Sequence, residues 1–187
     1  MNHRPRTWQR VLFALLLALV AILAHASEQD QRRILIGLKL FPAVLAADAD
    51  IRSKASSDGT LPLLLLYRTD RAGAERLAQR LSALEGIHGL RFAPQVAAYS
   101  DLANYANRSL AGIFLTEQSR SNLEAVIALA RERRAIAFSP FEDDVEHGIL
   151  SGLFVSDRIL PYLNMEALRL SGITLKPFFI EVAKHYE

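Results

Sequence analysis

The sequence predicts a single α/β domain: a mainly parallel sheet of about four strands flanked by helices, with a C-terminal hairpin and two closing helices. Between residues 61 and 138, short apolar runs alternate with amphipathic segments, which is the pattern of βα units around a parallel sheet. After Gly148, two extended runs meet at Ser156-Asp157, which indicates an antiparallel hairpin. A chain of 187 residues, 51% of them hydrophobic, has the material for one core but not for two domains.

The first 26 residues have the features of a secretory signal peptide. A basic stretch, MNHRPRTWQR, precedes an uncharged apolar run over 11–24, and Ala24-His25-Ala26 supplies the small residues that a signal peptidase requires. The apolar run is shorter than the roughly 20 residues of a membrane-spanning helix, so an uncleaved anchor is the weaker alternative. We expect cleavage after about Ala26 and a mature domain over 27–187 that does not span the membrane.

The basic character of the chain comes from this leader. The net charge of +2 depends on Arg4, Arg6 and Arg10, and without them 19 basic residues face 20 acidic ones, for a net charge of −1. A nearly neutral domain without a basic stripe offers no surface for nucleic acid. The chain has no cysteine, which excludes disulfides, thiolate metal sites and thiol nucleophiles.

The domain is expected to open with a helix over 31–51, where apolar residues recur at a spacing of three to four. Pro42 lies inside this pattern and predicts a kink or break near Phe41. The segment has more apolar residues than one helix face needs, so its part from 34 to 51 is also a candidate interface.

The remaining elements follow in order from the alternation of patterns. The helices that separate the first strands are an amphipathic one over 72–84, a short one opened by Ser100, and a third over 121–134. Gly172 ends a helix that begins near Met165, and Pro177 stands in the first turn of the closing helix. The predicted parallel strands are 61–67, 91–97, 110–115 and 135–138, and the hairpin covers 149–163.

An acidic cluster, FSPFEDDVEHG over 138–148, has the features of a short helix. Ser139 suits the N-cap, Pro140 the first helical position, and Glu142 completes a capping box with Ser139. Gly148 would end the helix. Capping and solvated charge therefore explain the cluster without a ligand.

The spacing within this cluster leaves a metal site open as an alternative. Asp143 and His147 are four residues apart, as are Glu142 and Glu146, so each pair would share a helix face and could offer two ligands to a divalent ion. A metal-dependent hydrolase could use Glu142, Asp143 and His147 around an activated water. The sequence has no HExxH, GxSxG, GxGxxG or Walker motif, and we predict neither a cofactor nor an enzymatic activity.

The C-terminal half has a characteristic order of elements. A strand ending in Ser leads through a variable loop to a Gly-bounded hairpin, then to Asn and a helix, a Gly-Ile step and a final helix that closes on Ala-Lys. The positions that carry this pattern are Ser139, Gly148, Asn164, Gly172, Ile173, Ala183 and Lys184. Together with the upstream order, which includes Leu40-Phe41-Pro42 and the strand AGIFLT, the pattern resembles the YfiR family of exported bacterial proteins.

This resemblance implies a single periplasmic α/β domain without catalytic residues. It implies a regulator or sensor that modulates an inner-membrane signalling protein, for example a diguanylate cyclase or a sensor kinase. Members are often dimeric, so a homodimer is one expected assembly. The chain departs from the family in lacking both the cysteines of some members and the Trp-Pro that usually closes the opening helix, which leaves the partner's identity open.

Two sites could carry function in such a domain. The acidic loop 140–148 and the hairpin 149–163 are expected to form a partner-binding surface, with Phe141 and Leu153 as exposed apolar residues beside the acids. Its expected residues are Phe141, Glu142, Asp143, Asp144, Glu146 and Leu153. The alternative is a periplasmic small-molecule-binding protein of transport type, with the ligand at the carboxyl ends of the strands near Arg68, Thr116 and Ser139. The lack of a second lobe counts against that alternative.

Overall fold

The computed structural model describes residues 28–187 as one α/β domain around a mostly parallel, seven-stranded sheet. The strand order is β2-β1-β3-β4-β5-β6-β7, and only the β5–β6 pair is antiparallel. The strands are β1 Thr60–Tyr67, β2 Arg91–Ala98, β3 Gly112–Leu115, β4 Ile136–Ser139, β5 Ser151–Val155, β6 Ile159–Asn164 and β7 Lys184–Tyr186. The predicted signal peptide lies outside the described residues. No helix within 28–187 is long and apolar enough to cross a bilayer.

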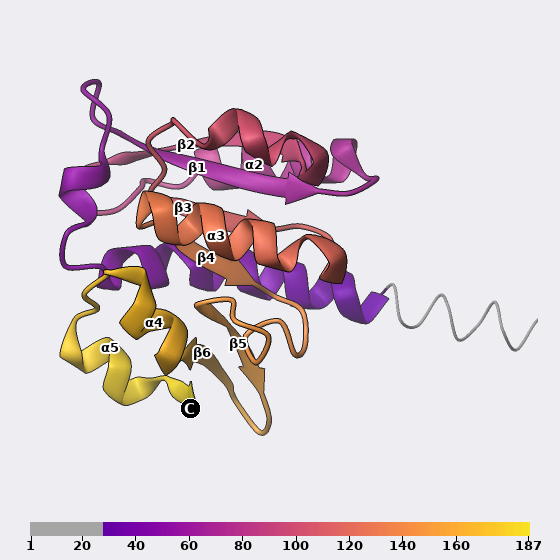
Figure 1. The fold of residues 1–187 in the computed structure, drawn as a ribbon, viewed down its shortest axis with the longest axis vertical. Helices are drawn as coiled ribbons and strands as arrows, with labels where there is room; N and C mark the ends of the chain where they lie inside the picture. Colours follow the sequence, from indigo (N-terminus) through magenta and orange to yellow (C-terminus); the bar gives the residue numbers. More distant parts are fainter. Residues whose placement is uncertain (1–27) are drawn as a thin grey trace, which may run out of the picture.

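The four predicted parallel strands and the hairpin are confirmed, and helices pack on both sides of the sheet. One core holds the opening helix, residues 28–47, against β1, β3 and β4, while a second core holds α3 against the opposite face (Figure 1). The other helices have the bounds η1 Ile51–Lys54, α2 Arg71–Ser82, η2 Tyr99–Tyr105, η3 Arg120–Asn122, α3 Leu123–Arg133, α4 Met165–Ser171 and α5 Pro177–Val182. The sheet is therefore the middle layer of three.

The opening helix is central to the first core and not an exposed interface. Phe41 is fully buried and packs against Phe114 and Phe138, with ring centroids 5.5 to 5.6 Å apart. Gly112 makes room for it, because a Cβ there would lie 2.7 Å from the Phe41 ring. The helix continues through Pro42, so the predicted break is wrong. Close packing on the sheet compensates for the backbone hydrogen bond that a proline cannot donate.

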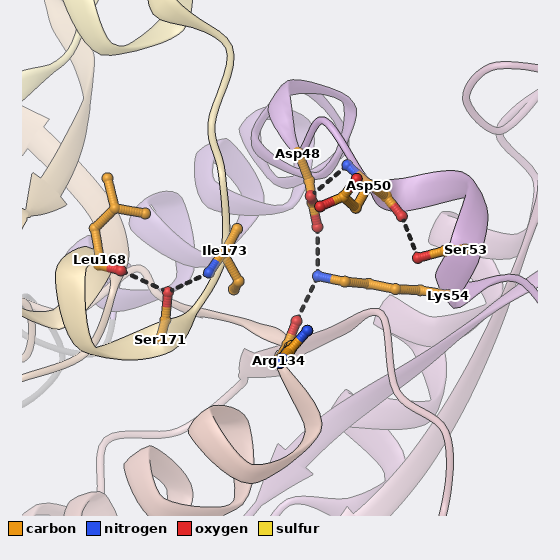
Figure 2. Close-up of polar contacts among 8 residues, drawn as sticks. All are labelled: Asp48, Asp50, Ser53, Lys54, Arg134, Leu168, Ser171 and Ile173. Carbon is orange, nitrogen blue, oxygen red and sulfur yellow. Dashed lines mark hydrogen bonds and ion pairs between the residues drawn. The ribbon is translucent and has the colours of Figure 1, made fainter.

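The C-terminal part contains one strand that the sequence patterns did not reveal. After α4, Gly172 adopts the left-handed conformation (φ 67°) expected at a helix end. Ser171 fixes this turn, since its hydroxyl donates to the Leu168 carbonyl and accepts from the Ile173 N–H (Figure 2). The closing helix α5 is short, and the chain then forms β7 in parallel with β6. The sheet thus ends in a short edge strand.

A buried ion pair joins four segments at the amino ends of the strands. Asp48, 1% exposed, follows the opening helix and pairs with Lys54 of η1, which also donates to the Arg134 carbonyl before β4 (Figure 2). The second carboxylate oxygen of Asp48 accepts the Asp50 N–H at 2.9 Å. A backbone bridge between Asp48 and Leu175 connects the α4–α5 loop to this cluster. The arrangement cross-links the end of the molecule at which the parallel strands begin.

Candidate functional site

The strand order reverses direction between β1 and β3. From β1 the chain moves to β2 on one side, then crosses back to β3 on the other, and such a reversal is where open α/β sheets bind ligands. The arrowhead of β1 points to the same side of the molecule as the start of the opening helix (Figure 1). The carboxyl end of the sheet therefore brings together the loops after β1, β3 and β4 and the start of this helix.

Glu117, directly after β3 and Thr116, ties the first two of these loops together. Its Oε2 accepts the backbone N–H groups of Arg68, Thr69 and Asp70, each at 2.8 Å, and its Oε1 accepts the Thr69 hydroxyl at 2.7 Å. These amides form the nest at the N-terminus of α2 that usually attracts an anion. Burial raises the pKa of Glu117, but the N–H donors outweigh it and hold the pKa below its usual value. The nest is filled by the protein's own carboxylate.

Two buried side chains hold the backbone around Glu117. The Tyr99 hydroxyl donates to the Glu117 carbonyl at 2.7 Å, and the Thr116 hydroxyl donates to the Leu66 carbonyl at 2.8 Å. Burial, with the nearby charge of Asp144 as a lesser cause, raises the pKa of Tyr99, which keeps its hydroxyl a donor. The loop after β3 is thus fixed from both sides.

A pocket of about 210 Å³ opens beside this loop, between the opening helix and α2. We call it the switch-point pocket. Its lining comprises Gln31, Ile34, Leu35, Asp70, Gly73, Ala74, Arg76, Leu77, Arg80, Thr116 and Glu117. Apolar and charged side chains are both present, as in small-molecule sites, although the volume is below the roughly 300 to 1,000 Å³ usual for drug-sized ligands. The pocket suits a small ligand.

Of the three residues predicted for a ligand at the strand ends, only Thr116 lines this pocket. Arg68 contributes its backbone N–H to the nest, while Ser139 is fully buried at the end of β4 and donates to Asp144 at 2.6 Å. Sequence reasoning missed Glu117. The usable signal was its place directly after a buried strand, opposite the polar Thr69-Asp70 turn that follows a neighbouring strand.

The acidic segment 140–148 is a series of turns, and the predicted short helix is wrong. Ser139 belongs to β4 rather than to an N-cap, and Glu142 does not complete a capping box. Asp143 has a φ of 65°, which a right-handed helix cannot contain. The hydroxyl of Ser139 accepts the Phe141 N–H at 3.2 Å and donates to the buried Asp144. A local tertiary contact replaces the helical cap.

Each carboxylate of this cluster has a partner of its own, so the four do not converge. Glu142 pairs with Arg33 of the opening helix at 3.0 Å, which also donates to the Pro140 carbonyl. Asp143 pairs with Arg120 at 3.0 Å, and Asp144 accepts from Ser139. Glu146 accepts the hydroxyl of Tyr162 on β6 at 3.0 Å. Through these contacts the turn connects the loop after β3, the opening helix and the hairpin.

The metal alternative fits this arrangement poorly. Arg120 lies between the two side chains that were to share an ion, with guanidinium nitrogens 3.0 Å from both Asp143 Oδ2 and His147 Nε2. Across residues 28–187 no three His, Cys, Asp or Glu side chains are grouped so that they could hold a metal. Glu142 and Glu146 contact different elements. The weak metal candidates Glu142, Asp143, Glu146 and His147 are therefore not brought together around one point.

The exposure expected for the partner surface is wrong at three positions. Phe141 packs in the second core, Leu153 packs in the first, and Asp144 is fully buried. Glu142, Asp143 and Glu146 remain exposed. The alternation of side chains along β5 explains Leu153, since it lies on the face that the opening helix covers. A partner could meet the three exposed acids but none of the buried side chains.

Asp144 carries a pH-dependent prediction. Burial raises its pKa, although the Ser139 hydroxyl opposes this effect. The native carboxyl then holds its proton more tightly than the unfolded one, so its contribution to stability is present at low pH and is lost as pH rises through the raised pKa. We expect Asp144→Asn to be more stable than the wild type at about pH 7, with the advantage shrinking as pH falls toward about 4, in urea unfolding curves.

Ser139→Ala is the matched control for this variant. It removes the hydroxyl that donates to Asp144 and leaves the buried charge in place, and it should cost about 1–3 kcal/mol of unfolding free energy at neutral pH. If the free energy of unfolding depends on pH in the same way for the wild type and Asp144→Asn, burial does not raise the pKa of Asp144 and the prediction is wrong.

Comparisons with known proteins bear on the fold. A scan against protein-family models finds no match, and a search of curated proteins finds none either. Among solved structures, an ABC domain in complex with L-Trp from Streptococcus pneumonia aligns with a TM-score of 0.52 at 11% identity, over 76% of this chain and 61% of that one. A conserved domain protein from Vibrio cholerae o1 biovar eltor aligns with a TM-score of 0.52 at 17% identity, over 72% of this chain and 57% of that one.

These likenesses identify an α/β architecture shared with part of two larger chains. This chain spans about three fifths of the length of each. At identities of 11% and 17%, the likeness supports a shared fold and says nothing about function. The chain thus has an α/β fold that is also found in a domain solved with a bound amino acid, and its own site must be argued from its own residues.

Proposed function

We propose that this chain is a non-enzymatic binding domain that takes a small molecule in the switch-point pocket. The observation that carries the proposal is the position of the pocket: it opens where the strand order reverses, at the carboxyl ends of β1 and β3. The support around it is rigid, because Glu117 closes the nest of the β1–α2 loop. That one structural neighbour was solved with L-Trp is compatible with this function.

The test uses a bulky side chain to fill the pocket. Leu35 is 39% exposed and lines the pocket from the opening helix, so Leu35→Trp should occupy the space without disturbing the core. We expect a metabolite library, screened by ligand-observed NMR, to yield at least one saturable ligand whose affinity falls at least tenfold in Leu35→Trp. Leu84→Trp, at another exposed leucine that does not line the pocket, is the matched control.

Either of two results would contradict the proposal. One is a library in which nothing binds the wild type. The other is a ligand that binds Leu35→Trp as tightly as the wild type, because it would occupy a different part of the molecule.

A second candidate is the exported regulator of an inner-membrane signalling protein that the YfiR resemblance implies. The hairpin supports it, since Val155 and Ile159 are directly opposed at its tip and are 48% and 47% exposed. Small exposed apolar groups on a projecting hairpin suit a protein contact. In this proposal the periplasmic part of the partner meets the hairpin tip and the exposed acids of the 140–148 turn.

Capture from crosslinked membranes of the native host tests this second candidate. We expect one signalling protein to be retained by the wild type and lost when Val155→Lys and Ile159→Glu are combined. Val182→Lys changes an apolar residue of similar exposure on α5 and serves as control. Retention of the same protein by the hairpin variant would exclude the tip as the contact.

A further inference from the structure

We propose that the ligand of the switch-point pocket is a small organic anion, with its charged head between Arg76 and Arg80 and its apolar body against the opening helix. This inference rests on the proposed function and adds the chemical class of the ligand. Three features support it: the carboxylates of the pocket are hydrogen-bonded within the protein, two arginines lie one turn apart on α2, and apolar side chains line the pocket beside them.

The acidic groups of the pocket are engaged within the protein. Glu117 Oε2 accepts three backbone N–H groups, and its Oε1 accepts the Thr69 hydroxyl. Asp70 is the N-cap of α2, where its Oδ1 accepts the Gly73 N–H at 2.8 Å. Each carboxylate thus has a local structural partner.

The basic groups are free by comparison. Arg76 lies 3.8 Å from Asp70, a long and exposed ion pair that contributes little. Arg80 forms no ion pair with any residue in the described range 28–187. The formal charges of the four ionisable lining residues sum to zero, but Arg80 is the one among them without a partner in the described range, and an anion would complement it.

The two arginines are placed to act together. They are four residues apart on α2, so they lie one above the other on the same side of the helix. Side chains of a helix tilt toward its N-terminus, and the guanidinium of Arg76 accordingly comes within 3.8 Å of Asp70, the N-cap of α2. A planar guanidinium fork matches a carboxylate or phosphate head.

The apolar part of the pocket lining comes from both helices. Ile34 and Leu35 of the opening helix lie opposite α2, and Ala74 and Leu77 lie on α2 itself, beside the arginines. Leu35 has 39% of its surface exposed here. A ligand with an apolar body would cover this surface, and a bare inorganic anion would not. The class is therefore an amphiphilic anion rather than free phosphate.

Because Glu117 already occupies the backbone amides of the nest, these amides are not available to bind a ligand's anion. In many α/β proteins the backbone amides at a helix N-terminus bind the ligand's anion, but here Glu117 occupies them. Recognition must come from the arginine side chains about two turns further along α2. Substitution of these side chains should therefore remove the affinity, which would not hold if backbone amides made the contact.

A matched series of six-carbon ligands tests the class. The wild-type protein is titrated by calorimetry with hexanoate, hexyl phosphate, hexanamide and hexylamine at low salt. We expect binding of hexanoate or hexyl phosphate, with the tighter of the two identifying the head group, and at least tenfold weaker binding of the amide and amine. Arg80→Gln should weaken the anion at least fivefold, and added salt should weaken it as well.

Arg71→Gln is the control, because Arg71 is on the same helix but pairs with Glu75 at 2.8 Å and does not line the pocket. It should bind the anion like the wild type. Preferred binding of hexylamine or hexanamide, or equal binding by Arg80→Gln, would overturn the anion class. If a library ligand sensitive to Leu35→Trp exists in that case, the proposed function stands and only this inference fails.

Discussion

Lys54→Met should lower the free energy of unfolding by about 3–5 kcal/mol, the cost of removing one partner of a buried ion pair. Asp48 is 1% exposed and depends on Lys54 for its countercharge. The methionine fills much of the same space but leaves the carboxylate without a cation. The Arg134 carbonyl also loses the ammonium donor. Urea unfolding followed by circular dichroism measures the loss.

The double variant Asp48→Asn/Lys54→Met separates the unpaired charge from lost packing. The asparagine side chain would keep an oxygen for the Asp50 N–H, which Asp48 accepts at 2.9 Å, and would carry no charge. The double variant should recover most of the stability lost in Lys54→Met, because replacing both ions costs far less than removing one. A double variant as unstable as the single one would show that the packing of the lysine stem matters more than its charge.

The parallel part of the fold could be predicted because its strands are buried on both faces. Continuous apolar runs such as 61–66 and 110–115 are typical of strands that are covered on both sides, and turn residues bounded them. β7 could not be found in this way. Its three residues, Lys184 to Tyr186, are polar or half-exposed at the edge of the sheet, and their parallel pairing with β6 depends on the path of the chain between them.

The acidic turn shows why a correct local pattern can predict the wrong structure. Ser139, Pro140 and Glu142 satisfy the rules for a helix start, and nothing nearby in sequence opposes them. In the fold, Arg33 attracts Glu142 from 109 residues away, and Ser139 bonds to Asp144 instead of capping. These tertiary partners outweigh the local preference, and the local sequence pattern does not encode them.

The pocket was only partly predictable for a related reason. The general rule that ligands meet strand ends pointed to Thr116, which does line the pocket. The alignment of the opening helix beside α2, which supplies the apolar wall and leaves the arginines opposite it, is a tertiary result. Charge alone did not single out Arg76 or Arg80, because amphipathic helices carry such residues on their solvent faces.

Glu117→Ala should lower the free energy of unfolding by about 2 kcal/mol, since hydrogen bonds to a charged acceptor are among the stronger ones. The substitution leaves three backbone N–H groups and the Thr69 hydroxyl without their acceptor. Water can reach part of this loop, which limits the loss. The loop between β1 and α2 should also become mobile, and hydrogen exchange of the amides of residues 68–70 should accelerate in the variant.

The emptied nest gives this variant a second, positive signature. Backbone amides at the start of a twelve-residue helix attract anions, so acetate should restore part of the lost stability in Glu117→Ala and should do nothing for the wild type. Glu117→Gln keeps the shape but not the charge. Because the N–H donors hold the pKa of Glu117 below its usual range, the advantage of the wild type over Glu117→Gln is fully present above that range and is lost as pH falls through the lowered pKa. If the wild type and Glu117→Gln differ equally in neutral and in strongly acidic buffer, the nest recognises the side chain's shape rather than its charge, and acetate would then fail to rescue Glu117→Ala as well.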